Sequence, residues 1–227
     1  MTAPAVLFDI DGTLIDSNYL HVHAWQRAFD EEDFDVEAWR IHRLIGMDGS
    51  KLVETLVPDA SDDAADRLKE LNSRFYMELI GLLRPLPGAL RLLDVVAEMG
   101  MQAVLATSAP EDELDALRKV LQRDDLVSAM TSSDDVGTAK PQPGIVEVAL
   151  KRADVPAERA VFVGDAVWDV RAAKRAGVEC IGVESGGIDR HLLLSEGAVA
   201  VYSNAQDLLD QLHDGPIGAL AAKYVQR

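Results

Sequence analysis

The sequence is short of basic residues, of cysteine and of long apolar runs. Only 22 Lys and Arg stand against 39 Asp and Glu in 227 residues, which gives a formal net charge of −17. Such a surface repels the phosphate backbone of nucleic acids and anionic lipid headgroups, so we expect neither as a partner. A small phosphorylated ligand would meet the same repulsion. It would need a bound cation, a lysine and backbone N–H groups gathered in one pocket.

Cys180 is the single cysteine, and it therefore has no partner for an intramolecular disulfide. No stretch approaches the roughly 20 consecutive apolar residues that a membrane span needs. The N-terminal Met-Thr-Ala-Pro lacks the basic region of a signal peptide. We therefore expect a soluble protein of the reducing cytoplasm, and nothing in the sequence demands more than a monomer or a weak dimer.

Short apolar runs alternate with helical patterns along most of the chain, which is 48% hydrophobic. The runs that predict strands are residues 5–8, 103–106, 160–163, 180–183 and 198–202, with a weaker one at 126–131. Strands separated by amphipathic helices are typical of a parallel sheet covered on both faces. The predicted fold class is α/β, with a Rossmann-like, doubly wound parallel sheet as its core.

One interval breaks this alternation. Residues 16–84 show helical periodicity and no comparable strand run, and two prolines in 84–88 stiffen the chain where the strand pattern resumes. We predict a catalytic core of residues 1–15 and 85–227 and an inserted helical cap domain of residues 16–84.

Two aspartates follow the first predicted strand, in Phe8-Asp9-Ile10-Asp11-Gly12-Thr13. Ligands of open parallel sheets bind beyond the carboxyl ends of the strands, and alternation sends the side chains of Asp9 and Asp11 to one side. Gly12 lets the backbone turn and approach a phosphate closely. A solvated Asp-Gly turn is the plain alternative.

Two further segments follow the same logic. Thr107 and Ser108 come after the second core strand and can donate to an anion, although ordinary helix capping explains them equally well. Lys140 precedes Pro141 and Pro143, which hold it on a stiff loop. A lysine fixed in so acidic a chain is a candidate charge clamp, whereas most lysines are merely solvated.

A fourth segment is the run from Val161 to Val170, a predicted strand that opens into a helix. Asp165 at the strand end can complete an oxygen-rich cation site with the first aspartates. Asp169 lies one helical turn later and can orient a bound water or Lys140. Favourable pairing with the helix dipole is the alternative for both. The glycine pair 186–187 predicts only a break in a loop.

These four segments, in this order, resemble the haloacid dehalogenase superfamily, specifically its phosphatases with a helical cap inserted after the first motif. The resemblance spans nearly the whole chain. It implies a Mg²⁺-dependent phosphatase of small phosphorylated metabolites that works through an aspartyl phosphate. True dehalogenases of the superfamily lack the second aspartate, so the presence of Asp11 argues against cleavage of carbon–halogen bonds.

The resemblance also implies a role for each matched residue. Asp9 would be the nucleophile and Asp11 the general acid and base. Mg²⁺ would be held by Asp9, the Asp11 carbonyl and Asp165. Gly12, Thr107 and Ser108 would contact the phosphate, Lys140 would balance its charge, and Asp169 would orient its neighbours.

The predicted cap adds weaker candidates. Residues 43–49 resemble a substrate-specificity loop, in which Gly46 permits a tight turn and Arg43 or Lys51 could bind a second anionic group of the substrate. Surface ion pairing explains these two cations equally well. His21 and His23 could contact substrate, but hinge packing and solvent exposure are the plainer explanations.

Two alternatives remain open. Asp16-Ser17 and His21 also resemble β-phosphoglucomutase, a phosphosugar mutase, although such mutases usually carry Glu-Asp where this chain has Gly164-Asp165 and an arginine where it has Gly49. A catalytically silent binding module is the second alternative. It would be expected to have lost one of the four motifs, and all four are present.

Overall fold

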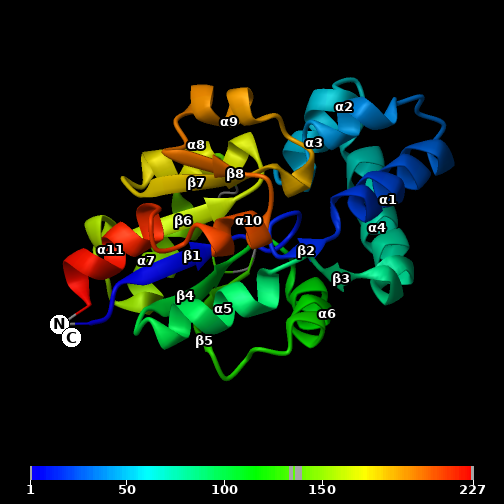
Figure 1. The fold of residues 1–227 in the computed structure, drawn as a ribbon. Coiled ribbons are helices and arrows are strands. Elements are labelled where there is room, and N and C mark those ends of the chain that lie inside the picture. The colour runs from blue at the N-terminus through cyan, green and yellow to red at the C-terminus, as the bar shows by residue number, and fades with distance from the viewer. Residues whose placement is uncertain (1, 133–134, 136–139, 226–227) are drawn as a thin grey trace. The chain divides into compact units, whose positions relative to one another are not determined.

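A computed structural model describes residues 2–132, 135 and 140–225 of the chain. The chain divides into two compact units (Figure 1). One consists of Met1–Asp16 and Arg84–Arg227, and the other of Ser17–Leu83. None of the helices in the described part of the chain combines the length and the hydropathy that a membrane span requires.

The first unit is built on a six-stranded parallel sheet in the order β5-β4-β1-β6-β7-β8. From β1 the chain adds β4 and then β5 on one side of the sheet. It then returns to β6, next to β1, and adds β7 and β8 on the other side, so the strand order reverses between β1 and β6. In open α/β sheets such a switch point is where ligands bind. The strands are β1 (Ala5–Phe8), β4 (Gln102–Ala106), β5 (Val127–Thr131), β6 (Ala160–Gly164), β7 (Glu179–Val183) and β8 (Ala200–Tyr202).

Helices lie on both sides of this sheet (Figure 1). One large core cluster combines apolar residues of the strands with buried residues of α7, α8 and α9. The helices of this unit are α5 (Ala89–Glu98), α6 (Glu111–Leu121), α7 (Gly144–Ala153), α8 (Val167–Arg175), α9 (Arg190–Glu196), α10 (Ala205–Asp210) and α11 (Pro216–Tyr224), with 3-10 turns η3 (Ala157–Arg159) and η4 (Glu184–Gly186). The predicted fold class is confirmed.

The central strands are apolar throughout because helices cover both of their faces. All four residues of β1 are completely buried, and all five of β6 are buried. A polar side chain directly after such a strand is therefore held at the edge of the sheet by a rigid neighbour. Asp9 follows β1 and Asp165 follows β6 in this way.

A two-stranded antiparallel ladder, which no strand pattern in the sequence predicts, lies at the ends of the insert. In it β2 (Ile15–Asp16) pairs with β3 (Arg84–Pro85), with Ile15 opposite Pro85 and Asp16 opposite Arg84. The ladder brings together residues that are 68 and 70 positions apart in the sequence, and it fixes where the chain leaves and re-enters the first unit.

The second unit is helical. It contains α1 (Asn18–Glu31), α2 (Ala38–His42), α3 (Gly49–Leu56), α4 (Asp62–Leu79) and the 3-10 turn η1 (Ile80–Leu82). Two of these helices begin at side-chain caps, since Asp48 accepts hydrogen bonds from the backbone of Ser50 and Lys51, and Ser61 accepts one from Ala64. Helices α1 and α4 pack along each other through buried side chains such as Phe29, Leu68 and Phe75.

Candidate active site

The loop that follows β1 holds Asp9 at the switch point of the sheet. The backbone N–H of Asp9 donates to the carbonyl oxygen of Val163 at 2.9 Å, which ties it to β6. Gly12 has φ +71°, a conformation that favours glycine. This turn lets the N–H groups of Leu14 and Ile15 donate back to the carbonyl oxygen of Ile10 at 2.9 and 3.0 Å. The loop is therefore stiff, and the Asp9 side chain projects from it with 6% exposure.

Lys140 is the buried cation of this region. Its Nζ lies 2.5 Å from Oδ1 of Asp9 and 2.7 Å from Oδ1 of Asp169, and the residue is 2% exposed. A lysine so deeply buried has to be paired, because an unpaired ammonium would lose its hydration without compensation. The structure thus brings together two residues that lie 131 positions apart in the sequence.

Two more aspartates lie at the end of β6 and at the start of α8. Asp169 is buried, and its Oδ2 accepts a hydrogen bond from the backbone N–H of Ala166 at 3.0 Å, which caps the helix. Asp165 is also buried, and its Oδ1 accepts a hydrogen bond from Oγ1 of Thr13 at 3.2 Å. Asp169 is therefore held by the start of α8 and orients Lys140. Asp165 is held by the hydrogen bond from Thr13, which belongs to the loop after β1.

Gly164 makes room for Asp169. A Cβ atom at Gly164 would lie 2.5 to 2.6 Å from the Oδ2, Cβ and Cγ atoms of Asp169. Atoms of this kind do not approach so closely, so any side chain at position 164 would displace the carboxylate that pairs with Lys140. The glycine at the end of β6 and the aspartate five residues later are thus structurally linked.

The surroundings of Asp9, the candidate nucleophile, disfavour its ionised form. Burial raises the pKa of Asp9 from 3.8 to about 7, with Asp169 and Asp11 acting in the same direction and Lys140 opposing them. Burial also works against the Lys140 ammonium, but Asp169 and Asp9 more than offset it, and the pKa of Lys140 is raised. One ammonium faces several carboxylates, so the cluster favours a further cation.

The raised pKa of Asp9 predicts a pH-dependent cost to stability in the metal-free protein. Between its ordinary value of 3.8 and about 7 the folded state retains a proton that the unfolded state has lost. The favourable contribution of Asp9 is therefore complete below about pH 4 and disappears as the pH rises towards 7. In chelator at pH 8 we expect the Asp9→Asn variant to be more stable than the wild type, and to lose this advantage by pH 4.

Denaturant unfolding of both proteins across this pH range checks the prediction. Only the difference between the two proteins is interpreted, because carboxylates remote from Asp9 titrate identically in both. A difference that stays constant from pH 4 to pH 8 would contradict the raised pKa.

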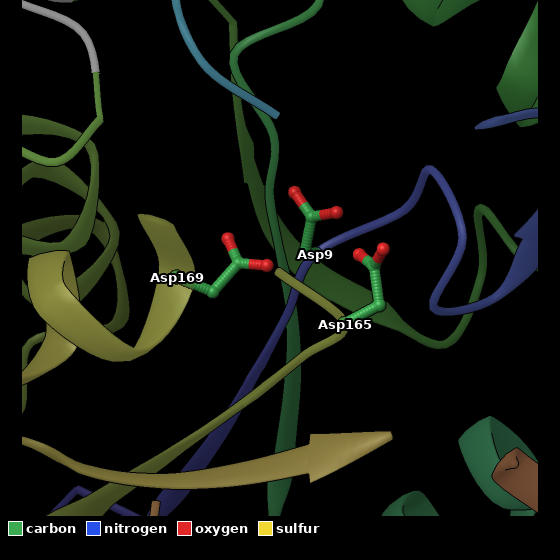
Figure 2. A group of neighbouring side chains, drawn as sticks. All are labelled: Asp9, Asp165 and Asp169. Carbon is green, nitrogen blue, oxygen red and sulfur yellow. The ribbon is translucent and has the colours of Figure 1, made fainter. Parts of the chain in front are cut away.

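Three of the carboxylates are close enough to share a metal ion. Figure 2 shows Asp9, Asp165 and Asp169 gathered at the ends of β1 and β6 and at the start of α8. One carboxylate oxygen of each lies within 4.8 Å of the others, and all three residues are buried. Oxygen donors of this kind suit the hard cation Mg²⁺. Lys140 and the Ala166 N–H each contact one oxygen of Asp169, so Asp9 and Asp165 are the two of these three carboxylates that fit a cation. The expected contribution of the Asp11 carbonyl stays a prediction.

The remaining candidates of the core lie at the same strand ends. Asp11 is half-buried two residues after Asp9. Thr107 follows β4, the neighbour of β1, and is 1% exposed. Its Oγ1 accepts a hydrogen bond from the N–H of Ala109 at 3.0 Å, and Ser108 between them is half-buried.

The candidates of the insert belong to the second unit. Arg43 is exposed, with its guanidinium 5.9 Å from the centre of the Trp39 ring. Gly46 has φ +87°, so the tight turn expected there is present. Lys51 pairs with Glu54 at 2.5 Å, and both side chains are 65% exposed.

The two histidines of α1 differ in environment. The ring of His21 stacks on the ring of Tyr76 with centroids 3.9 Å apart, which matches the packing explanation for this residue. His23 is exposed.

Three residues near the carboxylates were not identified from the sequence. Thr13 donates to Asp165, Ser185 donates to the Gly12 carbonyl oxygen at 2.6 Å, and Gly186 packs against Asp165. The prediction of a mere loop break at 186–187 holds for Gly187, which has φ +86°, but it is wrong for Gly186. Thr13 stands in the first motif but had no role assigned to it there. No sequence pattern distinguished Gly186 from its neighbour.

Residues 6–183 match the family described as haloacid dehalogenase-like hydrolase. Since this match covers most of the chain, the protein belongs to that family, as the four motifs predicted. Among curated relatives, the chain is 31% identical to a phosphoglycolate phosphatase of Rhodospirillum rubrum, over 92% of this chain and 90% of that protein. It is 33% identical to a phosphorylated carbohydrates phosphatase of Thermotoga maritima, over 92% of this chain and 98% of that protein.

Solved structures agree with this placement. A hydrolase from Pseudomonas syringae is 36% identical, with a TM-score of 0.89 over 93% of this chain and 98% of that one. A putative β-phosphoglucomutase from Bacteroides vulgatus has a TM-score of 0.86 at 23% identity, over 99% of this chain and 91% of that one, and this likeness shows the fold alone.

Proposed function

We propose that the protein is a Mg²⁺-dependent phosphatase of the cytoplasm that hydrolyses small phosphorylated metabolites through an aspartyl phosphate on Asp9. The observation that carries the proposal is the buried contact of Lys140 with Asp9 and Asp169, next to Asp165, at the switch point of the sheet. Relatives named as phosphatases of phosphoglycolate and of phosphorylated carbohydrates support this substrate class.

A carboxylate can attack a phosphate only where the negative charge of both is compensated. The net charge of −17 makes this requirement severe. Lys140 supplies one positive charge at the carboxylate of Asp9. Mg²⁺ held by Asp9 and Asp165 would supply Lewis-acid stabilisation of the charge on the transferring phosphoryl group. The Thr107 hydroxyl and the backbone N–H of Ser108 would bind phosphate oxygens.

The reaction has two displacements. In the first, a carboxylate oxygen of Asp9 forms a bond to phosphorus while the ester P–O bond breaks, and Asp11 gives its proton to the leaving alkoxide. In the second, Asp11 removes a proton from water, whose oxygen attacks phosphorus, and the bond between phosphorus and Asp9 breaks. Inorganic phosphate and the free carboxylate of Asp9 result. Asp169 takes no direct part and keeps Lys140 in place.

The role of Asp11 can be tested with leaving groups of different basicity. Asp11→Asn should lower kcat by roughly 10²–10⁴-fold on a sugar phosphate, the usual contribution of a general acid. On an aryl phosphate, whose leaving group departs without protonation, the first displacement should be affected much less, although turnover still needs Asp11 as the base of the second displacement. The burst of leaving group released in pre-steady-state kinetics on both substrates measures this difference. Wild-type kcat of the variant on a sugar phosphate would contradict the assignment.

The mutase alternative is disfavoured by the surroundings of Asp169. Mutases that resemble this chain usually carry glutamate at the position of Gly164, and any side chain there would collide with Asp169. The arginine they usually carry corresponds to Gly49. Lys51, which could replace it, already pairs with Glu54. We therefore propose that water, and not a second sugar phosphate, resolves the phosphoenzyme.

A panel of phosphoglycolate, sugar phosphates, nucleotides and an aryl phosphate tests the proposed function. We expect release of inorganic phosphate from several members, lost on removal of Mg²⁺ by chelation and restored by adding it back. Undiminished turnover in chelator would contradict the need for the cation. Absence of release from the whole panel would contradict the substrate class.

Incubation with β-glucose 1-phosphate, Mg²⁺ and a trace of glucose 1,6-bisphosphate separates the two enzyme classes. A phosphatase releases phosphate and yields little glucose 6-phosphate. Appearance of glucose 6-phosphate well ahead of phosphate would make the protein a mutase.

A further inference from the structure

Gly186 touches the Asp165 carboxylate directly. A Cβ atom placed on Gly186 would lie 1.7 Å from Oδ2 of Asp165 and 2.5 Å from its Cγ. The reason for glycine here is space, because positive φ occurs at the neighbouring Gly187 and not at Gly186. The buried backbone of Gly186 therefore forms one wall against the carboxylate.

The residue before it is tied to the loop that carries Asp9. Ser185 Oγ donates to the carbonyl oxygen of Gly12 at 2.6 Å, across 173 positions of sequence. Gly12 stands between Asp11 and Thr13, so this bond holds the loop at its turn. Adjacent residues of η4 thus contact the Asp9 loop and Asp165.

These contacts connect η4, the Asp9 loop and Asp165 to one another. Thr13, one residue after Gly12, donates from Oγ1 to Oδ1 of Asp165 at 3.2 Å. One oxygen of Asp165 is therefore fixed by Thr13 and the other is bounded by Gly186. A shift of η4 would move both the Asp9 loop and the wall behind Asp165.

Glu184, the first residue of η4, is also held in place by hydrogen bonds. Glu184 accepts hydrogen bonds from the backbone N–H and the guanidinium of Arg190, both at 3.2 Å. Arg190 begins α9, so the segment is anchored to a helix of the core. Because Glu184 anchors η4 to α9, Ser185 and Gly186 are suited to position the Asp9 loop and Asp165, which they contact.

We propose that Ser185 and Gly186 are positioning residues that set the relative placement of Asp9 and Asp165, and through it the affinity of the site for Mg²⁺. This inference rests on the proposed function, in which these two aspartates hold the cation. Residues that orient metal ligands typically contribute about 10- to 100-fold to metal affinity.

Titration calorimetry of Mg²⁺ into chelator-stripped protein is the direct test. We expect Gly186→Ala to raise the Kd for Mg²⁺ by about tenfold or more. Ser185→Ala should raise it by roughly fivefold, as for loss of one neutral hydrogen bond. Ser185→Thr keeps the hydroxyl and should bind nearly as the wild type does. With Mg²⁺ at saturation, both alanine variants should recover most of their kcat.

Two matched variants control for general damage. Gly100→Ala introduces a side chain at φ +73° after α5, where the nearest atom is Cγ1 of Val225 at 3.4 Å, and should lower stability without changing the Kd. Ser195→Ala removes a serine-to-carbonyl bond of 2.8 Å to Leu192 in α9. It too should leave the Kd for Mg²⁺ unchanged.

The outcomes separate this inference from the function on which it rests. If the wild type binds no Mg²⁺, the proposed cation site is wrong. If the wild type binds Mg²⁺ and both Gly186→Ala and Ser185→Ala bind it equally well, the positioning role is wrong. Should Gly186→Ala fail to fold, the comparison of Ser185→Ala with Ser185→Thr and Ser195→Ala decides alone.

Discussion

Replacement of Asp9 by asparagine is expected to reduce turnover to below detection, a loss of more than about 10⁴-fold. The amide is nearly the same size as the carboxylate but cannot form an acyl phosphate. The loss should therefore be present for every leaving group and already in the first displacement, whereas Asp11→Asn should still form the phosphoenzyme from an aryl phosphate. Phosphate release from sugar and aryl phosphates, measured with saturating Mg²⁺, gives the comparison.

Asp210→Asn is a suitable control. Asp210 is an exposed residue of α10 that accepts a hydrogen bond from Gln206 at 2.7 Å, and its replacement should leave turnover unchanged. Residual activity of Asp9→Asn within about a hundredfold of the wild type would mean that another group attacks phosphorus.

Replacement of Lys140 by methionine should affect both activity and stability. The variant retains the apolar stem but leaves Asp9 and Asp169 buried without their ammonium partner. Removing one member of a buried ion pair typically costs about 3–5 kcal/mol of unfolding free energy. Activity should fall by roughly 10²–10³-fold, as on loss of one preorganised group that stabilises the transition state.

Denaturant unfolding and steady-state kinetics measure the two effects. Arg91→Met is the matched control, because Arg91 pairs with Glu98 at 2.7 Å with more than half of each side chain exposed. Exposed pairs contribute about 0.2–1 kcal/mol, so this variant should be nearly as stable as the wild type and fully active. If Lys140→Met were equally unaffected, Lys140 would have no structural or catalytic part in the site.

The parallel sheet could be predicted because its central strands are continuous apolar runs. The run 160–163 corresponds to β6, which extends one residue further to Gly164, and the run 198–202 is shortened to Ala200–Tyr202. The family could be predicted as well, since its motifs lie at the strand ends as local patterns of a few residues. Strand ends meet at one edge of the sheet, so order along the chain carried information about proximity.

Features that depend on packing between distant segments had no local signal. The β2–β3 ladder joins residues at the two ends of the insert, and neither half resembles a strand by itself. Gly186 and Gly187 look alike in the sequence, although space is the reason for one glycine and backbone conformation for the other. The two glycines can be told apart only from the position of the Asp165 carboxylate, which lies 21 residues before Gly186 in the sequence.

The stereochemical course at phosphorus tests the central claim, two-step transfer through Asp9, most directly. A substrate made chiral at phosphorus with heavy oxygen isotopes and a sulfur atom is hydrolysed in isotopically labelled water, and the configuration of the product is determined. Each in-line displacement inverts phosphorus, so transfer first to Asp9 and then to water predicts overall retention. Inversion would mean that water attacks the substrate directly, and it would contradict the aspartyl phosphate.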